Sequence, residues 1–351
     1  DEGFAYMLIE DVVRMHLDRW FPGQEVRDAA AFRVTRDADM SVREDEAPDL
    51  LSGMEGVLEE RKASPCVRLE VEQACSRPLL SFLQKSLDVR SSDVYASSAP
   101  IYLGDFMRLA FVDGFDELRD DPWPPQPHPR IDPRKSLFET ITENDLLLHV
   151  PYHTFDPVVR FLEEAAADPD VLAIKQVLYR TSSDSAVVRA LLVAAANGKV
   201  VTVLLELKAR FDEARNIQWA RKLEQAGVQV VYGVRGLKTH AKACLVVRRE
   251  ASGIVRYLHL GTGNYNESTA RLYSDLGLLT KRPALGAELS AFFHAITGYS
   301  EPPLFTRLAM SPYGIRDTLL ELMDGEIRRC RQGHRARIEA KPREIYVTDV
   351  Y

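Results

Sequence analysis

Apolar runs alternate with helical patterns between residues 171 and 231, and this alternation restricts the fold more than any other feature of the sequence. Three runs have the length and composition of buried strands: residues 171–179, 200–207 and 228–231. Two helical segments lie between them: residues 185–197 and 216–226. Each is followed by a glycine, Gly198 or Gly227, the residue type that often ends a helix. Strands that alternate with helices predict an α/β domain built on a sheet.

A β-hairpin is predicted after the third of these strands. Residues 240–248 and 254–260 have strand patterns, and a short turn that ends at Gly253 joins them. Folding the hairpin about this turn sets His240 roughly opposite Gly263. The glycine-rich segment around Gly263 is therefore expected beside His240.

The rest of the chain has a different organisation. Helical patterns at residues 5–20 and 78–87, with a strand pattern at 66–71, predict a mixed α+β region. The proline-rich segment 122–129 can continue neither a helix nor a central strand, so it predicts a linker and a domain boundary. A last helical pattern covers residues 313–329.

Composition and charge exclude several classes of protein. A chain of 351 residues with 46% hydrophobic residues can form two or three folded domains. The net charge of -7 argues against a nucleic-acid or anionic-membrane surface spread over the whole molecule, so affinity for phosphates must come from local clusters. No apolar run approaches the roughly 20 residues of a membrane span.

The cysteines indicate the compartment. The chain has four cysteines: Cys66, Cys75, Cys244 and Cys330. None is part of a CxxC pair or has histidines at metal-site spacing, so neither a zinc site nor a disulfide framework is expected. A reducing, cytoplasmic location is predicted.

Two arginines follow the predicted parallel strands. Arg180 falls at the end of the first strand and Arg210 just past the end of the second. Ligands bind beyond the carboxyl ends of such strands, so both side chains are expected at one edge of the sheet. The loop 181–185 adds hydroxyl and backbone N–H groups at a helix N-terminus, which predicts an anion site. This edge is suited to phosphate.

His240 is the candidate nucleophile at the same edge. Strand alternation places Lys242 on the same face as His240, Lys238 is close in sequence, and Arg271 follows the glycine-rich segment. A neutral imidazole, with an ordinary pKa of about 6.5, attacks phosphorus without a separate base, while cations stabilise the transferring group. The pattern indicates phosphoryl transfer through a phosphohistidine.

Each of these residues also has a purely structural interpretation. A histidine at a strand start is usually structural, a Gly-Thr-Gly-Asn segment is usually a turn, and a single arginine usually forms a surface ion pair. Tyr273 is by default a core or hairpin residue, and Asp275 is an ordinary residue at a strand entry. His149 and His153 are interpreted as structural because no carboxylate stands at metal-ligand spacing. The joint placement of the charged groups favours a site.

Four segments of the sequence resemble the bacterial polyphosphate kinases: residues 178–180 (LYR), 206–213 (ELKARFDE), 236–242 (GLKTHAK) and 259–266 (HLGTGNYN). The resemblance implies that residues 1–125 are the later part of that family's middle domain. It implies that residues 126–310 form the first phospholipase-D-like catalytic domain, a mixed sheet flanked by helices. Residues 311–351 would be the truncated start of the second catalytic domain.

The resemblance also implies an activity, the reversible transfer of the terminal phosphate of ATP to inorganic polyphosphate through phosphorylated His240. Tyr273 matches a tyrosine that contacts the nucleotide, and Lys242 and Asn264 are assigned to the same ligand. Arg180 and Arg210 match positions associated with Mg²⁺. Since a guanidinium has no lone pair for a metal, both are interpreted as phosphate clamps beside the ion.

Further expectations follow from the same resemblance. The full-length protein is expected to form a homo-oligomer, to bind no nucleic acid, and to be cytoplasmic or associated with the inner face of the membrane. Two other functions stay open. A phospholipase-D-like phosphodiesterase needs a second H-x-K motif, and none is visible. A non-catalytic polyphosphate-binding fragment is the other alternative.

Overall fold

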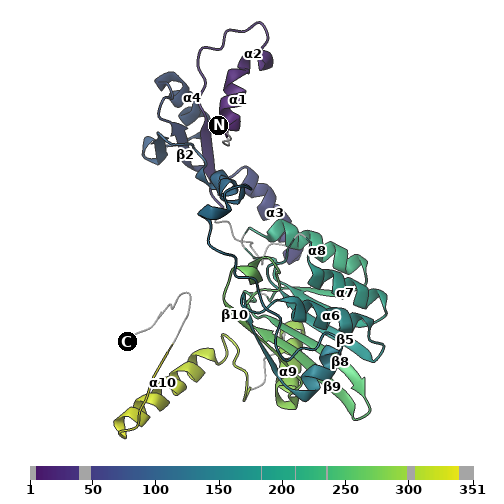
Figure 1. Cartoon of the computed structure of the whole chain (residues 1–351). Helices are drawn as coiled ribbons and strands as arrows, with labels where there is room; N and C mark the ends of the chain where they lie inside the picture. Colours follow the sequence, from purple (N-terminus) through teal and green to yellow (C-terminus); the bar gives the residue numbers. More distant parts are fainter. Residues whose placement is uncertain are drawn as a thin grey trace. The chain divides into compact units, whose positions relative to one another are not determined.

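The computed structural model describes residues 5–38, 49–182, 184–209, 211–234, 236–298 and 305–339. The chain divides into two compact units, Asp1–Trp123 and Pro124–Tyr351, which are described separately (Figure 1). Among the helices within these described ranges, none combines the length and the apolar character needed to cross a bilayer.

The first unit is a small α+β structure. Its helices are α1 (Ile9–Met15), α2 (Leu17–Trp20), α3 (Leu50–Lys62) and α4 (Arg77–Leu87), with short 3-10 helices at Ser91–Asp93, Leu103–Phe111 and Asp116–Leu118. Strands β1 (Phe32–Arg36), β2 (Cys66–Glu72) and β3 (Val94–Ser97) form one sheet in that order. Leu69 and Val71 of β2 and Leu83 of α4 are buried together in its core.

The second unit carries the larger sheet. Its strands are β4 (Leu146–Val150), β5 (Val171–Leu178), β6 (Val200–Leu205), β7 (Gln229–Tyr232), β8 (Ala243–Glu250), β9 (Gly253–Gly261) and β10 (Asp275–Thr280). Its helices are α5 (Leu137–Glu143), α6 (Asp156–Ala167), α7 (Ala186–Ala196), α8 (Glu213–Gln225), α9 (Pro283–Gly298) and α10 (Ile315–Arg331), with a 3-10 turn at Thr269–Arg271.

The seven strands have the order β4-β10-β9-β8-β5-β6-β7. Strands β5, β6 and β7 are parallel, and β8 runs antiparallel to β5, so the start of β8 lies at the edge where β5 and β6 end. Leu178 and Leu205, the last residues of β5 and β6, are register partners. This geometry brings the segments after β5 and β6 and the segment before β8 to one edge of the sheet.

Local sequence signals explain the boundaries of the central helices. The Ser185 side chain accepts a hydrogen bond from the Val188 N–H at 3.3 Å and so caps the N-terminus of α7. Gly198 and Gly227, at φ +78° and +82°, follow α7 and α8 in the left-handed conformation that glycine adopts without a steric penalty.

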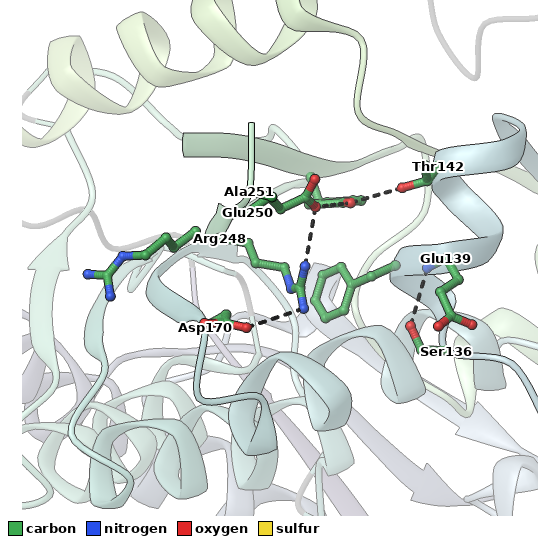
Figure 2. Close-up of a pocket in the computed structure, with 10 residues that line it drawn as sticks. Ser136, Glu139, Thr142, Asp170, Arg248, Glu250 and Ala251 are labelled. Carbon is green, nitrogen blue, oxygen red and sulfur yellow. Dashed lines mark hydrogen bonds and ion pairs between the residues drawn. The ribbon is translucent and has the colours of Figure 1, made fainter. Parts of the chain in front are cut away.

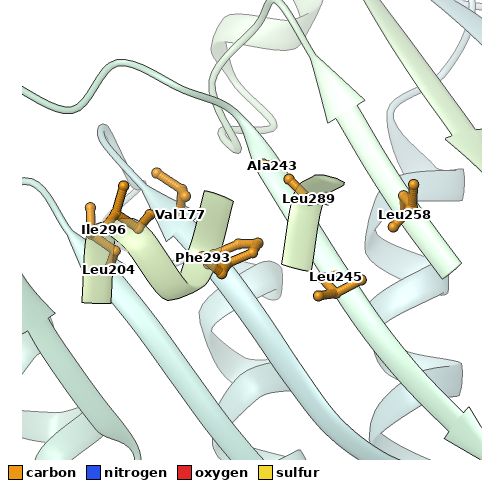
Figure 3. Packing of buried hydrophobic residues seen from close by; sticks show 8 residues of the cluster. All are labelled: Val177, Leu204, Ala243, Leu245, Leu258, Leu289, Phe293 and Ile296. Carbon is orange, nitrogen blue, oxygen red and sulfur yellow. The ribbon is translucent and has the colours of Figure 1, made fainter. Parts of the chain in front are cut away.

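Helices cover the sheet. Helices α6, α7 and α8 lie side by side along it, with α6 packed on α7 (Figure 1). Figure 3 shows helix α9 against a row of apolar side chains from four strands. The eight buried members of this cluster are Val177, Leu204, Ala243, Leu245, Leu258, Leu289, Phe293 and Ile296. Their burial holds β5, β6, β8 and β9 in one rigid layer.

The expected α/β class, a mixed sheet flanked by helices and preceded by an α+β region, is confirmed. The predicted strands and helices between residues 171 and 231 are present, as is the hairpin, in which Glu250 pairs with Gly253. Two details were wrong. The strand expected from His240 begins at Ala243, and the helix expected over 5–20 is interrupted between α1 and α2. The boundary predicted in the proline-rich segment agrees with the division of the chain between Trp123 and Pro124, and the Gln126 N–H in this segment donates to the Tyr152 carbonyl at 2.7 Å.

Candidate functional site

His240 lies in the segment between β7 and β8, three residues before β8 begins. The hairpin register pairs Ala243 with Leu260, and the Gly261 N–H donates to the Lys242 carbonyl at 2.9 Å, one step closer to His240. Continued by the same count, this register would set His240 across from Gly263. The observed pairing ends at Lys242 and Gly261, so the closeness of His240 and Gly263 stays a prediction.

The imidazole of His240 contacts the ring of Tyr179, the first residue after β5. The two ring centroids are 4.9 Å apart and the planes meet at 76°, an edge-to-face contact. The pKa of His240 is lowered, first by desolvation and then by the positive charges of Lys242, Lys238 and Arg180. The side chain is nevertheless exposed at the surface. His240 is therefore an accessible imidazole whose surroundings favour the neutral form.

Lys242, two residues after His240, is almost completely buried, at 6% exposure. Its ammonium group donates to the His240 carbonyl at 2.5 Å and lies 5.2 Å from the centre of the Tyr179 ring. Desolvation lowers its pKa to about 8, although the negative charge of Asp275 opposes this shift. Lys242 therefore places a partly desolvated cation whose charge acts on the imidazole. The strand alternation from which this was predicted does not apply, because β8 begins only at Ala243.

A buried carboxylate fixes the segment that carries His240. Glu206, the first residue after β6, is completely buried and accepts hydrogen bonds from two backbone N–H groups, that of Thr239 at 2.6 Å and that of Lys208 at 2.8 Å. The Lys208 ammonium donates to the Leu237 carbonyl at 2.7 Å. The end of β6 is thus tied to both residues that flank Lys238.

Asn216, on helix α8, joins the ends of β5 and β6. Its side-chain amide N–H group donates to the Tyr179 carbonyl and to the Glu206 carbonyl, each at 2.9 Å, and its oxygen accepts from the Thr181 hydroxyl at 3.3 Å. The residue is completely buried. A buried amide with all these partners holds Tyr179 and Glu206 in a fixed relation.

Arg180 follows Tyr179 at the predicted edge and already has an anionic neighbour. Its Nε lies 3.2 Å from Oδ2 of Asp212, and Asp212 also pairs with Arg215 at 2.9 Å. Arg180 therefore forms the ion pair expected if it is a structural residue, and its charge also acts on His240. Arg210, its predicted companion, lies outside the described residues.

The anion site predicted in the loop 181–185 is wrong. The carboxylate of Glu267 accepts a hydrogen bond from the Ala186 N–H at 2.9 Å and another from the Ser182 hydroxyl at 3.1 Å. Glu267 comes from the segment after β9, and it supplies the negative charge that the N-terminus of α7 favours. A side chain of the protein thus occupies the position expected for a phosphate.

The Gly-Thr-Gly-Asn segment is shaped by Asp275. The Thr262 hydroxyl donates to Asp275 at 2.8 Å, and a Cβ atom at Gly263 would lie only 2.6 Å from the same carboxylate. Glycine is required by this close approach. Asn264 holds its side-chain oxygen buried without a hydrogen-bond partner in the described part of the chain, so this oxygen can accept a ligand donor.

Tyr273 lies two residues before β10 and its side chain is 56% exposed. The interpretation as a core residue is therefore wrong. Its backbone N–H donates to the Thr269 carbonyl at 2.9 Å, which fixes the main chain and leaves the ring accessible.

The histidines near the end of β4 contact one another and Ser274. The His149 N–H donates to Nδ1 of His153 at 3.0 Å, and His149 Nε2 lies 3.1 Å from the Ser274 hydroxyl. Within the described ranges no three histidine, cysteine or acidic side chains gather as a metal site.

A separate hollow of about 640 Å³ lies at the hairpin end of β8, away from His240 (Figure 2). The Arg248 guanidinium there faces the carboxylates of Asp168, Asp170 and Glu250, at 2.8, 3.7 and 3.3 Å. The Tyr257 hydroxyl is hydrogen-bonded to Glu250 and to Thr142. Since these polar groups pair with one another, we interpret the side chains around this hollow as a structural network.

Sequence reasoning missed the roles of Tyr179, Glu206, Asn216 and Glu267. One signal was present for Glu206, because a carboxylate directly after a run of buried apolar residues needs hydrogen-bond partners. The partners of Tyr179 and Glu267 come from distant segments, so no local pattern identified them.

Two family descriptions match the chain. Residues 1–109 match the polyphosphate kinase middle domain, and residues 136–302 match the polyphosphate kinase C-terminal domain 1.

Curated relatives and one solved structure are similar along nearly the whole chain. A polyphosphate kinase of Rhodopirellula baltica is 52% identical over 350 residues, which cover 100% of this chain and 41% of the relative. A polyphosphate kinase of Mycobacterium avium is 47% identical over 96% of this chain and 46% of the relative. The crystal structure of polyphosphate kinase from Porphyromonas gingivalis matches with a TM-score of 0.73 and 32% identity, over 95% of this chain and 48% of that one. The chain spans less than half the length of these proteins.

Proposed function

Because the chain belongs to the polyphosphate kinase family, we propose that it carries the phosphoryl-transfer centre of an ATP:polyphosphate phosphotransferase, with His240 as the nucleophile. The observation that supports this most directly is the exposed His240 imidazole beside Lys242, with the Tyr179 ring against it. The lowered pKa of His240 favours the neutral, nucleophilic form at physiological pH.

The proposed reaction has two steps. A lone pair of the His240 imidazole attacks the terminal phosphorus of ATP, a P–N bond forms, and the P–O bond to the departing ADP breaks. The ring N–H proton leaves to solvent or stays on the phosphoimidazole according to pH. A terminal oxygen of polyphosphate then attacks the same phosphorus, the P–N bond breaks, and the polymer is longer by one phosphate. Each step is reversible.

Cations that surround His240 supply the electrostatic stabilisation. Phosphoryl transfer depends on positioning and on positive charge around the equatorial oxygens. Lys242, Arg180 and Lys238 all shift the pKa of His240 through their charges, so all three lie within effective electrostatic range of the imidazole. Arg180 and Arg210 are proposed as phosphate clamps.

Magnesium fits this centre only if phosphate oxygens of the substrate hold the ion. The guanidinium groups of Arg180 and Arg210 offer no lone pair, and the described residues contain no cluster of three metal-binding side chains. When bound with ATP, Mg²⁺ would neutralise phosphate oxygens. The proposal assigns none of this chain's side chains to the ion.

The nucleotide is proposed to contact Tyr273 and Asn264. The Tyr273 ring is exposed near Asp275, and the buried Asn264 oxygen has no partner among the described residues. An aromatic ring and a free acceptor suit a base and its amino group, respectively. For the whole protein we also propose the domain assignments, the homo-oligomer and the cytoplasmic location predicted from the sequence.

The test is formation of a labelled phosphohistidine. The complete protein that contains this chain is incubated with γ-labelled ATP and Mg²⁺, and the label is followed in acid and in alkali. We expect label that is lost in acid, survives alkali and maps to His240. His240→Ala should remove it, whereas His294→Ala, an exposed histidine on α9, should not.

A non-catalytic polyphosphate-binding role gives a different result. Such a protein would bind polyphosphate but acquire no label. Label that persists in the His240→Ala protein, or that survives acid, would end the phosphohistidine assignment.

A further inference from the structure

Tyr179 lies at the centre of the charged groups around His240, although its own side chain carries no charge. It is the first residue after β5, and its ring is half-buried. Three cationic groups lie within 6 Å of its ring centre: the Lys242 ammonium at 5.2 Å, the Arg180 guanidinium at 5.7 Å and the Lys238 ammonium at 5.8 Å. The His240 imidazole lies 4.9 Å from it.

These three cations repel one another, so their convergence needs a compensating attraction. Asp212 supplies part of it, by pairing with Arg180 at 3.2 Å. Asp275 acts electrostatically on Lys242. The Tyr179 ring supplies another part, because the negative face of an aromatic ring attracts cations within about 6 Å.

The position of the ring is fixed from behind. The Tyr179 carbonyl accepts a hydrogen bond from the buried Asn216 side chain at 2.9 Å, and the same amide group is bonded to the Glu206 carbonyl. Glu206 in turn holds the Thr239 N–H, one residue before His240. The ring and the imidazole are therefore mounted on one hydrogen-bonded framework.

We propose that Tyr179 is a positioning residue of the phosphoryl-transfer centre: its ring sets the orientation of the His240 imidazole and gathers Lys242, Lys238 and Arg180 around the incoming phosphate. The inference rests on the proposed function. The aromatic ring of Tyr179 performs this positioning, and its hydroxyl group is not required. Tyr179 touches His240 and acts through it and through the cations.

The first test measures the contact between the Tyr179 and His240 rings, and it does not depend on enzymatic activity. In the NMR spectrum of the labelled chain, the imidazole C–H resonances of His240 should carry a ring-current displacement that is kept in Tyr179→Phe and lost in Tyr179→Leu. His240→Gln assigns the resonances. Unchanged His240 resonances in Tyr179→Leu would overturn the contact, whatever the enzyme does.

The second test measures catalysis in the complete protein. Tyr179→Phe should keep kcat within about twofold, whereas Tyr179→Leu should lower kcat at least tenfold with little change in KM for ATP, because the nucleotide still binds but the imidazole is misaligned. Equal losses in Phe and Leu would assign the effect to the hydroxyl and reject the proposal. A wild-type protein that forms no phosphohistidine would instead reject the proposed function and leave the NMR result intact.

A third variant covers the case in which Tyr179→Leu does not fold. Pentafluorophenylalanine at position 179 keeps the shape of a phenyl ring but reverses its quadrupole. The proposal expects this protein to fold like Tyr179→Phe, with weaker polyphosphate binding and a kcat at least fivefold lower than that of Tyr179→Phe. Activity and affinity equal to those of Tyr179→Phe would show that the cations do not depend on the ring.

Discussion

The carboxylate of Glu206 accepts a hydrogen bond from the backbone N–H of Thr239 at 2.6 Å, across 33 residues of sequence. This bond connects the end of β6 to the residue immediately before His240. Because Glu206 is completely buried and also accepts from the Lys208 N–H, its two oxygens orient the segment that presents the imidazole.

Replacement of Glu206 by glutamine should therefore damage both stability and activity. A glutamine keeps one acceptor oxygen but turns an amide N–H group toward a backbone donor, and a buried unsatisfied group costs about 1–3 kcal/mol. We expect Glu206→Gln to lower the free energy of unfolding by that amount, measured by urea denaturation, and to reduce phosphohistidine formation. Glu163→Gln, on the exposed face of α6, is the control and should change neither. Equal stability of the two variants would contradict the assigned role.

The pH dependence of phosphotransfer should report His240 and Lys242. A protonated imidazole cannot attack, and the pKa of His240 is lowered, so the acid limb of kcat/KM should lie below the ordinary imidazole value of about 6.5. As pH rises through about 8, Lys242 loses its charge and with it the stabilisation of phosphate oxygens. The profile should be bell-shaped, with its alkaline limb near pH 8.

Lys242→Arg assigns the alkaline limb. Because a guanidinium stays charged at high pH, the limb should move upward in this variant, whatever its absolute rate. An alkaline limb that stays near pH 8 would belong to another group.

The two arginines should dominate affinity for polyphosphate. Hydrogen bonds between charged groups are worth about 1.5–3 kcal/mol each, so Arg180→Ala and Arg210→Ala should each weaken binding at least tenfold, measured by titration calorimetry. Binding should also weaken with added salt. Arg282→Ala is the control, because Arg282 forms an ion pair with Asp145 at 2.6 Å beyond the far end of β10. Unchanged affinity in a folded Arg180 or Arg210 variant would remove that residue from the site.

Tyr273 should affect the nucleotide without affecting the fold. Since its side chain is 56% exposed, Tyr273→Phe and Tyr273→Ala should change the free energy of unfolding by less than about 0.5 kcal/mol. Stacking on a base is worth about 1–3 kcal/mol, so Tyr273→Ala should weaken ATP binding about tenfold. Equal losses in both variants would instead indicate a contact between the hydroxyl and a phosphate. Tyr313→Ala, at a similarly exposed tyrosine, is the control. Normal ATP binding by both Tyr273 variants would exclude Tyr273 from the site.

Local sequence determined most of the secondary structure around the site. The apolar runs of β5 and β6, the serine cap of α7 and the glycines after α7 and α8 all act within a few residues, so their positions were predictable. The hairpin register was predictable for the same reason, since a short turn fixes the pairing of its strands. The same register is the basis for predicting that His240 lies beside the glycine-rich segment.

Only the tertiary structure decided which side chains satisfy one another at the sheet edge. The N-terminus of α7 had the local signature of an anion site, but Glu267, 81 residues from its partner Ala186, occupies it. The edge contact of Tyr179 with His240 likewise depends on β8 lying antiparallel beside β5. Local patterns specify where a strand or helix begins and ends, whereas these contacts arise when the strands assemble into one sheet and bring distant residues within the few ångströms over which charges and rings interact.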